Sequence, residues 1–473
     1  MTQTITIDPV TRLEGHGKIT IQLDSQGQVE DAHFHVTQVR GFEKFSQGRP
    51  YYEMPSLTAR ICGICPVSHL LASAKACEAI MSVRIPHTAA QLRRVLNLAQ
   101  MVQSHALSFF HLSSPDLLLG MESDPAKRHI FGVAAARPDL GLAGIGLRRF
   151  GQHIIELLGT KRIHTGWVVP GGVTEPLTAA HRDEILATLP EAYANVALAL
   201  TAYKQIAGNF KPEIEVFANF PSNYMGLINE DESIEFTDGA LRLIDPAGAI
   251  IEDGIDAQHF TEVIGEAVEN YSYTKFVYYK PLGYPEGSYR VGPLPRLNIA
   301  KSMGTPQADE ELALFKQMAA GPIESSFHYH HARLVEALYG IEKIEEILAD
   351  PLILDKHVRA TAGVNRLEGA GQIEAPRGTL NHHYKVDENG LITWASLVVA
   401  TGHNNNAMNR GVLQSARAYV KDGKFTAGAL NRVEAVIRTF DPCLSCSTHA
   451  YGQMPLVLTL VNADGEVVDR VIS

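Results

Sequence analysis

The stretch that decides the fold is "DPCLSCSTHA", residues 441–450, which carries two cysteines three positions apart. A second pair lies near the other end of the chain, in "RICGICPVSH" at residues 60–69. Almost the whole chain separates Cys65 from Cys443, so the two pairs can meet only if the complete fold brings them together. We therefore expect one large domain that closes around a shared four-cysteine site.

Three kinds of site fit these cysteines. Structural zinc is the commonest owner of four thiolates, but zinc ribbons usually place their pairs about 15 to 20 residues apart. A site that needs the entire fold to assemble is better suited to a buried reaction centre with a shared metal. Two separate redox dithiols are the third possibility, although a thioredoxin-like βαβ context is missing.

The local sequence favours thiolates at both places. Pro66 follows the first pair directly, and proline is common in the first turn of a helix. Cys62 and Cys65 would then lie where free amide hydrogens and the helix dipole stabilise negative charge. Cys77 is the only other cysteine and cannot by itself hold an iron–sulfur cluster. Electrons from a redox-active metal would therefore leave through another protein.

The composition is that of an ordinary globular protein, with 45% hydrophobic and 20% charged residues among 473. The formal net charge of −11 argues against nucleic acid and anionic membrane surfaces as partners. We find no run of 18 apolar residues and expect no membrane-spanning helix. The start, "MTQTITIDPV", lacks the features of a secretory signal, so we expect a cytoplasmic protein.

Hydrophobic periodicity predicts an α+β fold, with a large, mostly helical domain, long core helices and small antiparallel sheets near the termini. Alternating residues predict strands in "TITID", "GKITIQL" and "VEDAHFHV" near the start, and in "HHYKVDENGLITWASLVVA" near the end. Helical spacing covers 87–112, 177–208 and 330–350, whereas glycine and proline break up 211–300. The last residues, "PLVLTLVNADGEVVDRVIS", predict a hairpin about Asp464 and Gly465.

Six ordered motifs resemble those of the large subunit of nickel–iron hydrogenases, most closely the soluble NAD-reducing (bidirectional) type. The resemblance covers essentially the full chain. The motifs are "DPVTRLEGH" (8–16), "RGFEKFSQGRP" (40–50), "RICGICPVSH" (60–69), "SHALSFFHLSSPD" (104–116), "EAPRGTL" (374–380) and "DPCLSCSTHA" (441–450).

The resemblance implies a nickel ion held by all four cysteines. Cys65 and Cys446 would bridge to an iron that carries cyanide and carbon monoxide, with Cys62 and Cys443 as terminal ligands. The residues implied around the pair are Arg377 above it, Pro376 in the wall, His69 beside the iron-side thiol, Thr401 as a hydrogen-bond donor to a cyanide, and Asp116 and Asp441 as the groups that orient Arg377. The segment "VVATGHNN" around Thr401 departs from the commoner Pro-Ser/Thr-Thr-Trp-Asn form of the family.

The resemblance also implies a magnesium site and a removable tail. Glu43, His449 and the backbone carbonyl of Leu397 would bind magnesium together with waters. A maturation endopeptidase would act after nickel-insertion proteins, leaving 1–449 as the mature domain and removing 450–473. We expect this extension to hold the C-terminal cysteine strand open until metal is delivered.

The implied reaction is the reversible heterolytic cleavage of dihydrogen into protons and electrons. Because a guanidinium stays protonated, we expect Cys443 to accept the proton first, Glu14 to pass it on, and Arg377 to act by its charge. The chain has no Gly-x-Gly-x-x-Gly loop. Diaphorase subunits with flavin (FMN), together with a small iron–sulfur subunit, would therefore carry electrons to NAD.

Other functions remain open at this point. The same chemistry could serve a deazaflavin acceptor or a hydrogen-sensing regulatory subunit. Relatives in respiratory complex I have lost the thiol pairs that this chain retains, and a zinc-stapled structural protein would contain no nickel. We expect the histidines of "HYHHAR" (328–333), His382 and His383 to be structural, and Cys77 to be a small buried hydrophobe.

Overall fold

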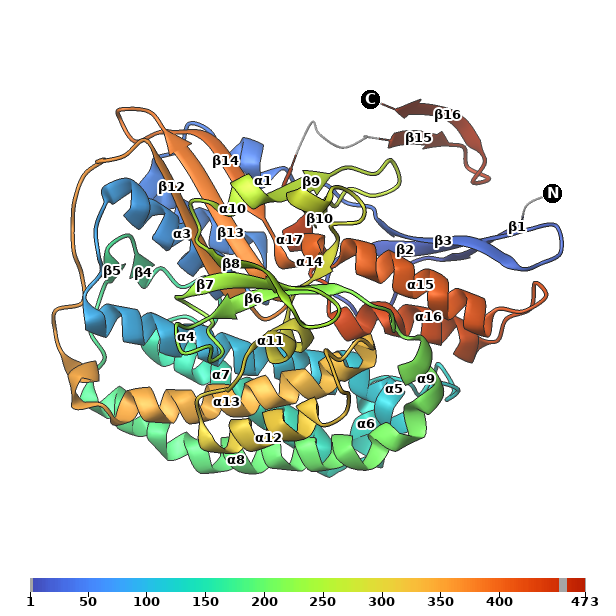
Figure 1. Ribbon diagram of the computed structural model, residues 1–473, viewed down its shortest axis with the longest axis horizontal. Coiled ribbons are helices and arrows are strands. Elements are labelled where there is room, and N and C mark those ends of the chain that lie inside the picture. The colour runs from blue at the N-terminus through green and yellow to red at the C-terminus, as the bar shows by residue number, and fades with distance from the viewer. Residues whose placement is uncertain (1–2, 451–456, 473) are drawn as a thin grey trace.

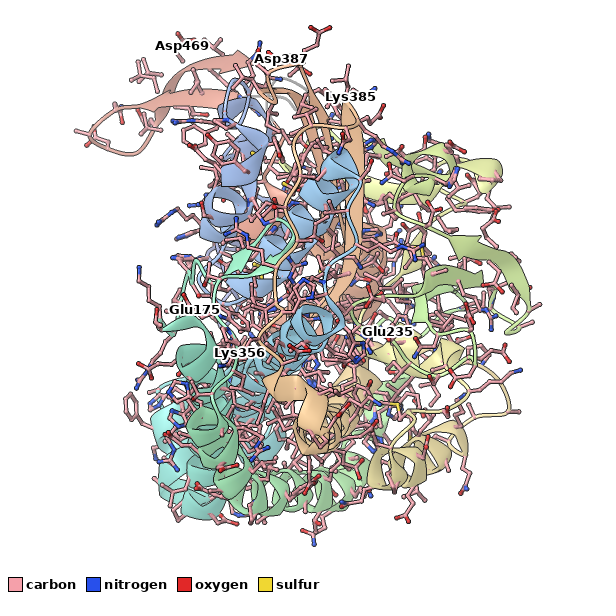
Figure 2. All side chains as sticks on the ribbon, turned by 90° about the vertical axis from the view of Figure 1, so that its left-hand side faces the viewer. Glu175, Glu235, Lys356, Lys385, Asp387 and Asp469 are labelled. Atoms are coloured by element: carbon pink, nitrogen blue, oxygen red, sulfur yellow. The ribbon has the colours of Figure 1, made fainter. Side chains whose placement is uncertain are left out.

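The computed structural model describes residues 3–450 and 457–472, and it shows the predicted α+β architecture (Figure 1). Long helices form the lower part of the molecule in this view, and small sheets lie above them. One large apolar core runs from Val10 to Cys446, with a smaller cluster around the strands of 223–291. Side chains fill the space between the layers, and charged residues such as Lys385 and Asp387 lie at the outer end (Figure 2).

The helical layer is built on the central helix α4. Its second half, from Val95 onward, is buried on every side, because other helices cover it. The long helices that pack in this layer are α4 (His87–Ala106), α7 (Pro138–Gly159), α8 (Ala179–Ala207) and α13 (Tyr329–Ala349). The predicted helices at 87–112, 177–208 and 330–350 are therefore confirmed, apart from their ends.

The end of α4 differs from a regular helix. The chain widens into a π-helical segment, Leu107–Ser113, and continues as α5 (Ser114–Leu119). Pro115 has no amide hydrogen to continue the α-helical ladder, and the Ser114 hydroxyl donates instead to the Phe110 carbonyl. This irregular turn brings Asp116 into the core, where it is 2% exposed.

A three-stranded sheet lies against α3 (Pro66–Met81) and consists of β12 (Glu368–Ala375), β13 (Gly378–Val386) and β14 (Ile392–Val398). Glycines allow strand and helix to approach closely, since a Cβ atom on Gly371 would lie 2.3 Å from the Ala72 carbonyl oxygen. Pro376 and Arg377 form the short turn between β12 and β13. This packing places Arg377 near the start of α3, which directly follows Cys65.

The N-terminal sheet consists of β1 (Gln3–Ile7), β2 (Gly17–Leu23) and β3 (Val29–Val36), which are the three predicted strands. Helix α15 (Asn405–Tyr419) packs on β3, and α16 (Ala427–Phe440) packs on α15. The chain then reaches the second cysteine pair through Asp441, which has a left-handed backbone with φ 54°. The N-terminal sheet and the helices that lead to the second cysteine pair thus pack together.

The remaining elements are short. The other helices are α1 (Phe42–Phe45), α2 (Met54–Thr58), α6 (Ile130–Ala136), α9 (Lys211–Val216), α10 (Phe260–Val263), α11 (Pro293–Ile299), α12 (Pro306–Lys316), α14 (Ala400–His403) and α17 (Leu444–Ser447). The other strands are β4 (Val168–Val169), β5 (Gly172–Val173), β6 (Asn223–Ile228), β7 (Ala240–Ile244), β8 (Ile250–Ile255), β9 (Ile264–Ala267), β10 (Phe276–Tyr279) and β11 (Tyr289–Arg290). Single 3-10 turns occupy Tyr51–Glu53, Ala59–Ile61, Gly208–Phe210, Lys280–Leu282, Ser326–His328 and Pro351–Leu354.

The C-terminal tail forms the predicted hairpin, with strands β15 (Val457–Val461) and β16 (Val467–Ile472) joined by a turn at Gly465. It lies at the edge of the molecule, and its apolar side chains, including Leu458 and Leu460, are exposed (Figure 1). The preceding residue Ala450 is only 1% exposed.

One stretch differs from the expectation about membranes. By length and composition alone, the helical stretch 179–216 could cross a membrane. Its longest part, α8, packs against α7 and α13, and its side chains Tyr193 and Lys204 bond to Glu345 and Glu311. These contacts are those of an outer helix in the helical layer.

Candidate metal centre

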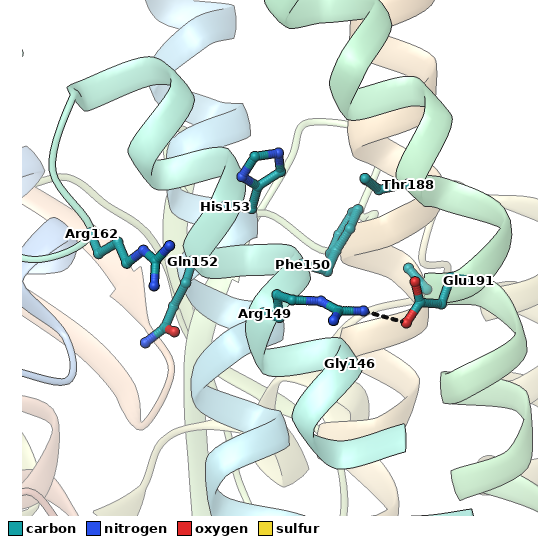
Figure 3. Close-up of a pocket in the computed structure, with 9 residues that line it drawn as sticks. Gly146, Arg149, Phe150, Gln152, His153, Arg162, Thr188 and Glu191 are labelled. Atoms are coloured by element: carbon teal, nitrogen blue, oxygen red, sulfur yellow. Dashed lines mark hydrogen bonds and ion pairs between the residues drawn. The ribbon is translucent and has the colours of Figure 1, made fainter. Parts of the chain in front are cut away.

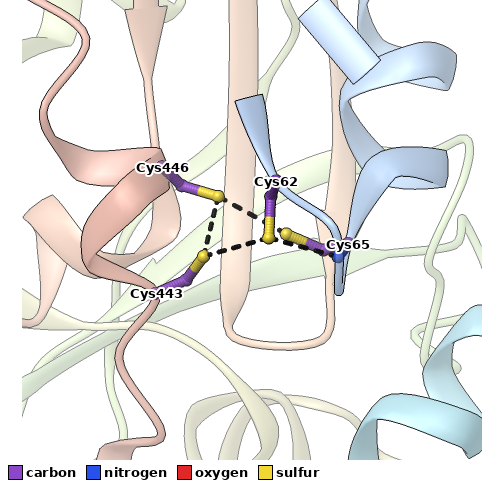
Figure 4. Close-up of side chains that lie close together, drawn as sticks. All are labelled: Cys62, Cys65, Cys443 and Cys446. Atoms are coloured by element: carbon purple, nitrogen blue, oxygen red, sulfur yellow. Dashed lines mark hydrogen bonds between the residues drawn. The ribbon is translucent and has the colours of Figure 1, made fainter. Parts of the chain in front are cut away.

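Four buried sulfur atoms meet at the centre of the structure (Figure 4). The Sγ atoms of Cys62 and Cys443 are 3.4 Å apart, those of Cys65 and Cys446 are 3.5 Å apart, and those of Cys443 and Cys446 are 2.9 Å apart. In the part of the chain that the structure describes, no other cluster of three or more His, Cys, Asp or Glu side chains has this geometry. The two pairs therefore form one shared site and are not separate dithiols.

Each cysteine pair stands at the beginning of a helix. Cys65 directly precedes Pro66 at the start of α3, and the amides of Ile64 and Cys65 donate to the Cys62 sulfur over 3.2 and 3.5 Å. Cys443 precedes α17 in the same way. Free amide hydrogens at a helix start favour thiolates, so both pairs present sulfurs that are prepared to bind a cation.

The sulfurs cannot all carry a negative charge without such a cation. Burial raises the pKa values of the Cys443 and Cys446 thiols well above the ordinary range. Hydrogen bonds from neighbouring thiols, Cys443 first, lower the pKa of Cys62. A metal ion removes this conflict because it deprotonates the thiols that bind it. Four soft sulfur donors suit nickel, iron or zinc.

A small cavity of about 20 Å³ lies against the sulfurs of Cys65, Cys443 and Cys446. A structural zinc site is normally closed by its four ligands and needs no adjoining space. The cavity can hold a second metal or small ligands beside three of the sulfurs. The residues that complete its walls are Ser68, His69, Ala375, Pro376, Arg377, Leu380, Val399, Ala400 and Thr401.

Arg377 brings a fixed positive charge to this cavity. Its Nε donates to the carbonyl oxygen of Asp441 over 2.6 Å, its Nη2 to Asp441 Oδ1 over 3.1 Å, and its Nη1 to Ser104 Oγ over 3.4 Å. Burial acts to lower the pKa of Arg377, but Asp441 and the cysteine sulfurs raise it well above its ordinary value. The guanidinium is therefore held protonated.

Thr401 contacts Cys443, and His69 contacts Cys446. The Cys443 amide donates to Thr401 Oγ1 over 2.9 Å, and the ring nitrogen Nε2 of His69 lies 3.3 Å from the Cys446 sulfur. Burial lowers the pKa of His69 to about 4, so its imidazole is neutral near pH 7. Thr401 thus contacts the backbone of Cys443, and His69 lies beside the Cys446 sulfur.

The loop that carries Glu14 runs beside the second cysteine pair. The Leu444 amide donates to the Glu14 carbonyl oxygen over 3.1 Å, and the Ser445 amide donates to Glu14 Oε2 over 3.0 Å. The Ser445 hydroxyl donates to the other carboxylate oxygen. The carboxylate thus contacts the segment that carries Cys443 and is half-buried.

Ser445 is two positions after Cys443, and the backbone bond from Leu444 to Glu14 pairs the two segments in parallel. The first motif of the chain and the last therefore lie side by side. This pairing holds the Glu14 carboxylate beside the segment that carries Cys443.

Asp116 does not lie where the sequence motifs place it. Among the described residues, the hydrogen-bond partners of Arg377 are Asp441 and Ser104, and Asp116 is not one of them. Asp116 instead accepts from Arg12 over 2.6 Å and from Arg438 over 3.0 Å. Asp116 lies in α5, after the π-helical segment, and its carboxylate faces Arg12 in the loop that contains Glu14.

Burial acts to raise the pKa of Asp116, but Arg438 and Arg12 outweigh burial and lower it. Asn431 adds a further hydrogen bond over 3.0 Å. Arg438 in turn donates to the carbonyl oxygen of Thr11 over 3.1 Å. The expectation that Asp116 orients Arg377 is therefore replaced by a different one, in which Asp116 holds the loop 11–16.

Glu43 and His449 meet on the other side of the second cysteine pair. His449 Nδ1 lies 2.9 Å from Glu43 Oε1, and the Leu397 amide donates to the same oxygen over 2.8 Å. Burial acts to raise the pKa of Glu43, but His449, Lys275 and this amide lower it overall. The three residues named for magnesium are thus adjacent, at the buried end of the C-terminal motif.

Several residues at the centre are not predicted from the sequence. Arg40 ties the two cysteine segments together, because its Nη1 donates to the Ile61 carbonyl over 2.5 Å and its amide to the Thr448 carbonyl over 2.9 Å. Gln100 holds the start of α3 by accepting from the Val67 amide over 2.8 Å. Arg40 stands in one of the six motifs, which is a usable signal, whereas nothing in the sequence marks Gln100.

A larger surface groove of about 350 Å³ lies between α7 and α8, far along the chain from any predicted site residue (Figure 3). An ion pair between Arg149 and Glu191, with 2.7 Å between Nη2 and Oε1, crosses it. Gly146 and Phe150 form part of its floor. The groove contains none of the cysteines, and its charges already neutralise one another.

Comparisons with known proteins agree with this geometry. Residues 4–39 match a family described as HoxL-like, and residues 40–127 and 247–449 match the family described as nickel-dependent hydrogenase. The chain is 41% identical to the NAD-reducing hydrogenase HoxS subunit beta of Cupriavidus necator, over 99% of both chains. It is also 41% identical to one subunit of the vhc F420-non-reducing hydrogenase of Methanococcus voltae, over 96% of this chain and 97% of the relative.

A solved structure shows the same fold at similar identity. The crystal structure of an NAD⁺-reducing NiFe hydrogenase in the H₂-reduced state matches with a TM-score of 0.92 and 42% identity. The match covers 94% of this chain and 99% of that chain. The likeness therefore extends over nearly the whole fold and is not limited to the cysteine motifs.

The cluster around Asp116 gives a prediction about stability and pH. Asp116→Asn removes the buried carboxylate that lies between Arg12 and Arg438, so we expect the free energy of unfolding to fall by about 3 kcal/mol at neutral pH. The lowered pKa of Asp116 means that its contribution is present above about pH 4 and is lost as pH falls through the folded-state pKa. Denaturant unfolding of both proteins should therefore show a difference that narrows in acid.

The matched control is Asp139→Asn, which removes a carboxylate from an exposed pair with Arg137. We expect almost no change in unfolding from this control, because exposed pairs contribute little. Equal stability of Asp116→Asn and the wild type at neutral pH would contradict the assignment of Asp116 as the centre of a buried charge cluster.

Proposed function

Because the chain belongs to the nickel-dependent hydrogenase family, we propose that it is the catalytic large subunit of a nickel–iron hydrogenase that couples dihydrogen to NAD. The observation that carries the proposal is the meeting of four buried sulfurs from both ends of the chain, beside a cavity that contains the Arg377 guanidinium. A zinc staple would account for the sulfurs but not for the cavity and its charge.

Cys62, Cys65, Cys443 and Cys446 are the residues that would hold the metals. Cys65, Cys443 and Cys446 border the cavity and Cys62 does not. Cys65 and Cys446 would help to hold, beside the nickel, an iron with cyanide and carbon monoxide ligands. When bound, the nickel–iron pair would supply the Lewis acidity and the redox capacity for heterolytic cleavage of dihydrogen. Thr401 supplies a hydroxyl, and Pro376 an apolar wall, at the place where the diatomic ligands would lie.

The proton is accepted by Cys443 and passed to Glu14. A buried Arg377 whose pKa is raised well above its ordinary value is a poor base, so a cysteine sulfur is the better acceptor. The Glu14 carboxylate lies on the Ser445 amide and hydroxyl, in the segment that also carries Cys443. General acid–base transfer needs this kind of short path between groups that are already positioned.

Arg377 acts through its charge and its position. Asp441 and Ser104 hold the guanidinium in one orientation, so it does not need to reorganise as charge shifts at the centre. Its positive charge also balances part of the negative charge of four thiolates in a site from which water is excluded.

Magnesium would bind at Glu43, His449 and the Leu397 carbonyl. The position of Glu43 between the Leu397 amide and His449 supports this site. Waters would complete the coordination, as is usual for magnesium. The ion would then fix the end of the C-terminal motif against the segment 40–50.

Electrons would leave through an iron–sulfur subunit, then reach NAD through diaphorase subunits that carry FMN. The support is the likeness to NAD-reducing relatives, together with the absence of a dinucleotide-binding loop from this sequence. A partner with deazaflavin would use the same metal centre, so the partner subunits decide the acceptor. We place the complex in the cytoplasm.

Residues 450–473 would be removed during maturation by an endopeptidase, after nickel-insertion proteins have acted. The structure, with the tail attached, has all four sulfurs within 4.8 Å. In this conformation the extension does not hold the cysteine strand open, contrary to the expectation from the sequence. His449 and Ala450 are 2% and 1% exposed, so a protease could reach the bond between them only after local opening.

The first prediction from this proposal concerns the metals. The purified native complex should contain nickel and iron at about one nickel for each copy of this chain, because its four cysteines form one site. Its infrared spectrum should show cyanide and carbonyl stretches. Zinc in place of nickel, with no such bands, would refute the proposed function.

The second prediction concerns the proton route. Glu14→Gln keeps the hydrogen-bonding size of the side chain but cannot carry a proton, so dihydrogen–deuterium exchange and dihydrogen oxidation should fall by about a hundredfold or more. Nickel content and infrared bands should stay those of the wild type. Glu53→Gln, a substitution at an exposed position in the same region of the chain, is the control, and normal turnover of Glu14→Gln would disprove the relay.

The third prediction concerns the tail. Intact mass measurement of the active complex should give a chain that ends at His449. The extension begins at Ala450, which is buried next to the C-terminal motif. Metal-free chain from cells grown without nickel should retain residues 450–473. Full activity in a preparation whose chain carries the whole tail would contradict removal.

A further inference from the structure

A chain of buried polar groups runs from the Cys446 sulfur into the interface between α3 and β13. His69 Nε2 lies 3.3 Å from that sulfur, and His69 Nδ1 lies 3.1 Å from His382 Nε2. His382 Nδ1 in turn lies 2.6 Å from the Tyr384 hydroxyl, which donates to Ser73 Oγ over 2.9 Å. The histidines, the tyrosine and the serine are 0% or 1% exposed.

Beyond Ser73 this row of hydrogen-bonded groups ends in the protein interior. Ser73 bonds to the Cys77 thiol, and Cys77 donates to the Tyr51 carbonyl over 3.1 Å. A carbonyl accepts hydrogen bonds and has no proton to give. The chain therefore has a closed end, which suits a role in fixing side chains and not in exporting protons.

The partner of His69 is unusual for a histidine beside a metal site. Such histidines mostly donate their second ring nitrogen to a carboxylate or a carbonyl, which fixes the tautomer. Here the partner is another imidazole, and a neutral imidazole can donate or accept at a given nitrogen. Only one hydrogen can lie between the two facing nitrogens, which are 3.1 Å apart, so one ring donates and the other accepts.

The direction of the bonds then depends on the sulfur. A thiol at Cys446 can donate to His69 Nε2, with every later bond pointing away from the site. A metal-bound thiolate only accepts, so the Nε2 of His69 must carry the hydrogen. With one hydrogen on each ring, His69 Nδ1 then accepts from His382, and His382 Nδ1 accepts from the Tyr384 hydroxyl, whose single hydrogen no longer points to Ser73.

We propose that His382 and Tyr384 are positioning residues for the metal centre, because their hydrogen bonds orient the His69 ring so that it donates to the Cys446 sulfur when that sulfur is a metal-bound thiolate. This inference rests on the proposed function. Tyr384 suits the task because its hydroxyl also has Thr58 as a neighbour, so it keeps a hydrogen-bond partner in either direction. His382, which the sequence suggested was structural, thus becomes part of the surroundings of one metal ligand.

The decisive variant is Tyr384→Phe, which removes one hydroxyl and keeps the ring. His382 Nδ1 would then lose its donor, and the His69 bond to the thiolate would weaken. We expect the cyanide and carbonyl stretches of the purified complex to shift. Nickel retention against a competing chelator should fall by about ten- to a hundredfold, the usual effect of losing a group behind a metal ligand.

The matched control is Tyr203→Phe. Tyr203 is also buried, in a helix, but within the described part of the chain its hydroxyl has no hydrogen-bond partner. The infrared bands and the nickel retention of the Tyr203→Phe complex should equal those of the wild type. Should Tyr384→Phe fail to assemble, His382→Gln tests the same bond one step closer to His69 and should shift the same bands.

The outcomes separate the two proposals. Nickel and diatomic bands in the wild type, with shifted bands in Tyr384→Phe and unshifted bands in Tyr203→Phe, support both. Wild-type spectra and nickel retention in Tyr384→Phe or, where that variant does not assemble, in His382→Gln overturn the positioning role while the proposed function stands. A wild type without nickel overturns the proposed function and this inference with it.

Discussion

The whole structure depends on keeping four sulfur ligands together in a place that water does not reach. Four thiolates in contact repel one another and lose their hydration when they are buried, so a cation must compensate them. The chain brings them together from positions 62, 65, 443 and 446. The fold between these positions must hold the two cysteine pairs next to each other. The helical layer and the sheet on α3 can be understood as the support that makes this closure rigid.

That closure is held by bonds between the two ends of the chain, most of them to backbone atoms. Arg40 bonds to carbonyls of both cysteine segments, and Glu14 accepts amide and hydroxyl hydrogens from Ser445. Arg377 bonds to the carbonyl and the carboxylate of Asp441. Backbone contacts fix the path of the chain and not only one rotamer, which explains how ligands so far apart in sequence can be placed within a few ångströms.

Much of this could be predicted from the sequence. The cysteine spacing alone required a shared site or separate dithiols, and the motifs around Arg377, Glu43 and His449 marked residues that the structure brings near the sulfurs. The strands near both ends and the long helices followed from ordinary periodicity. Asp116 was misplaced because its partners Arg12 and Arg438 lie 104 and 322 residues away along the chain, and nothing in "SHALSFFHLSSPD" marks them.

His382 and Tyr384 show a second limit. Alternation in β13 places both on the same face of a strand, and their burial was foreseeable. What could not be foreseen is the neighbour across the interface, because Ser73 and His69 lie on α3, some three hundred residues earlier. Contacts of this kind depend on how one helix packs on one sheet, here through the close approach at Gly371.

The polar groups around the cavity divide into two kinds, and the division bears on what the site can do. The charged side chain of the lining, Arg377, is held by the carboxylate of Asp441. The uncharged ones, Ser68, His69 and Thr401, line the cavity together with apolar side chains. One fixed positive charge among neutral walls is an environment in which charge that develops at the sulfurs is felt strongly. A site built only to staple a fold has no need of that arrangement, whereas a site that separates a proton from two electrons does.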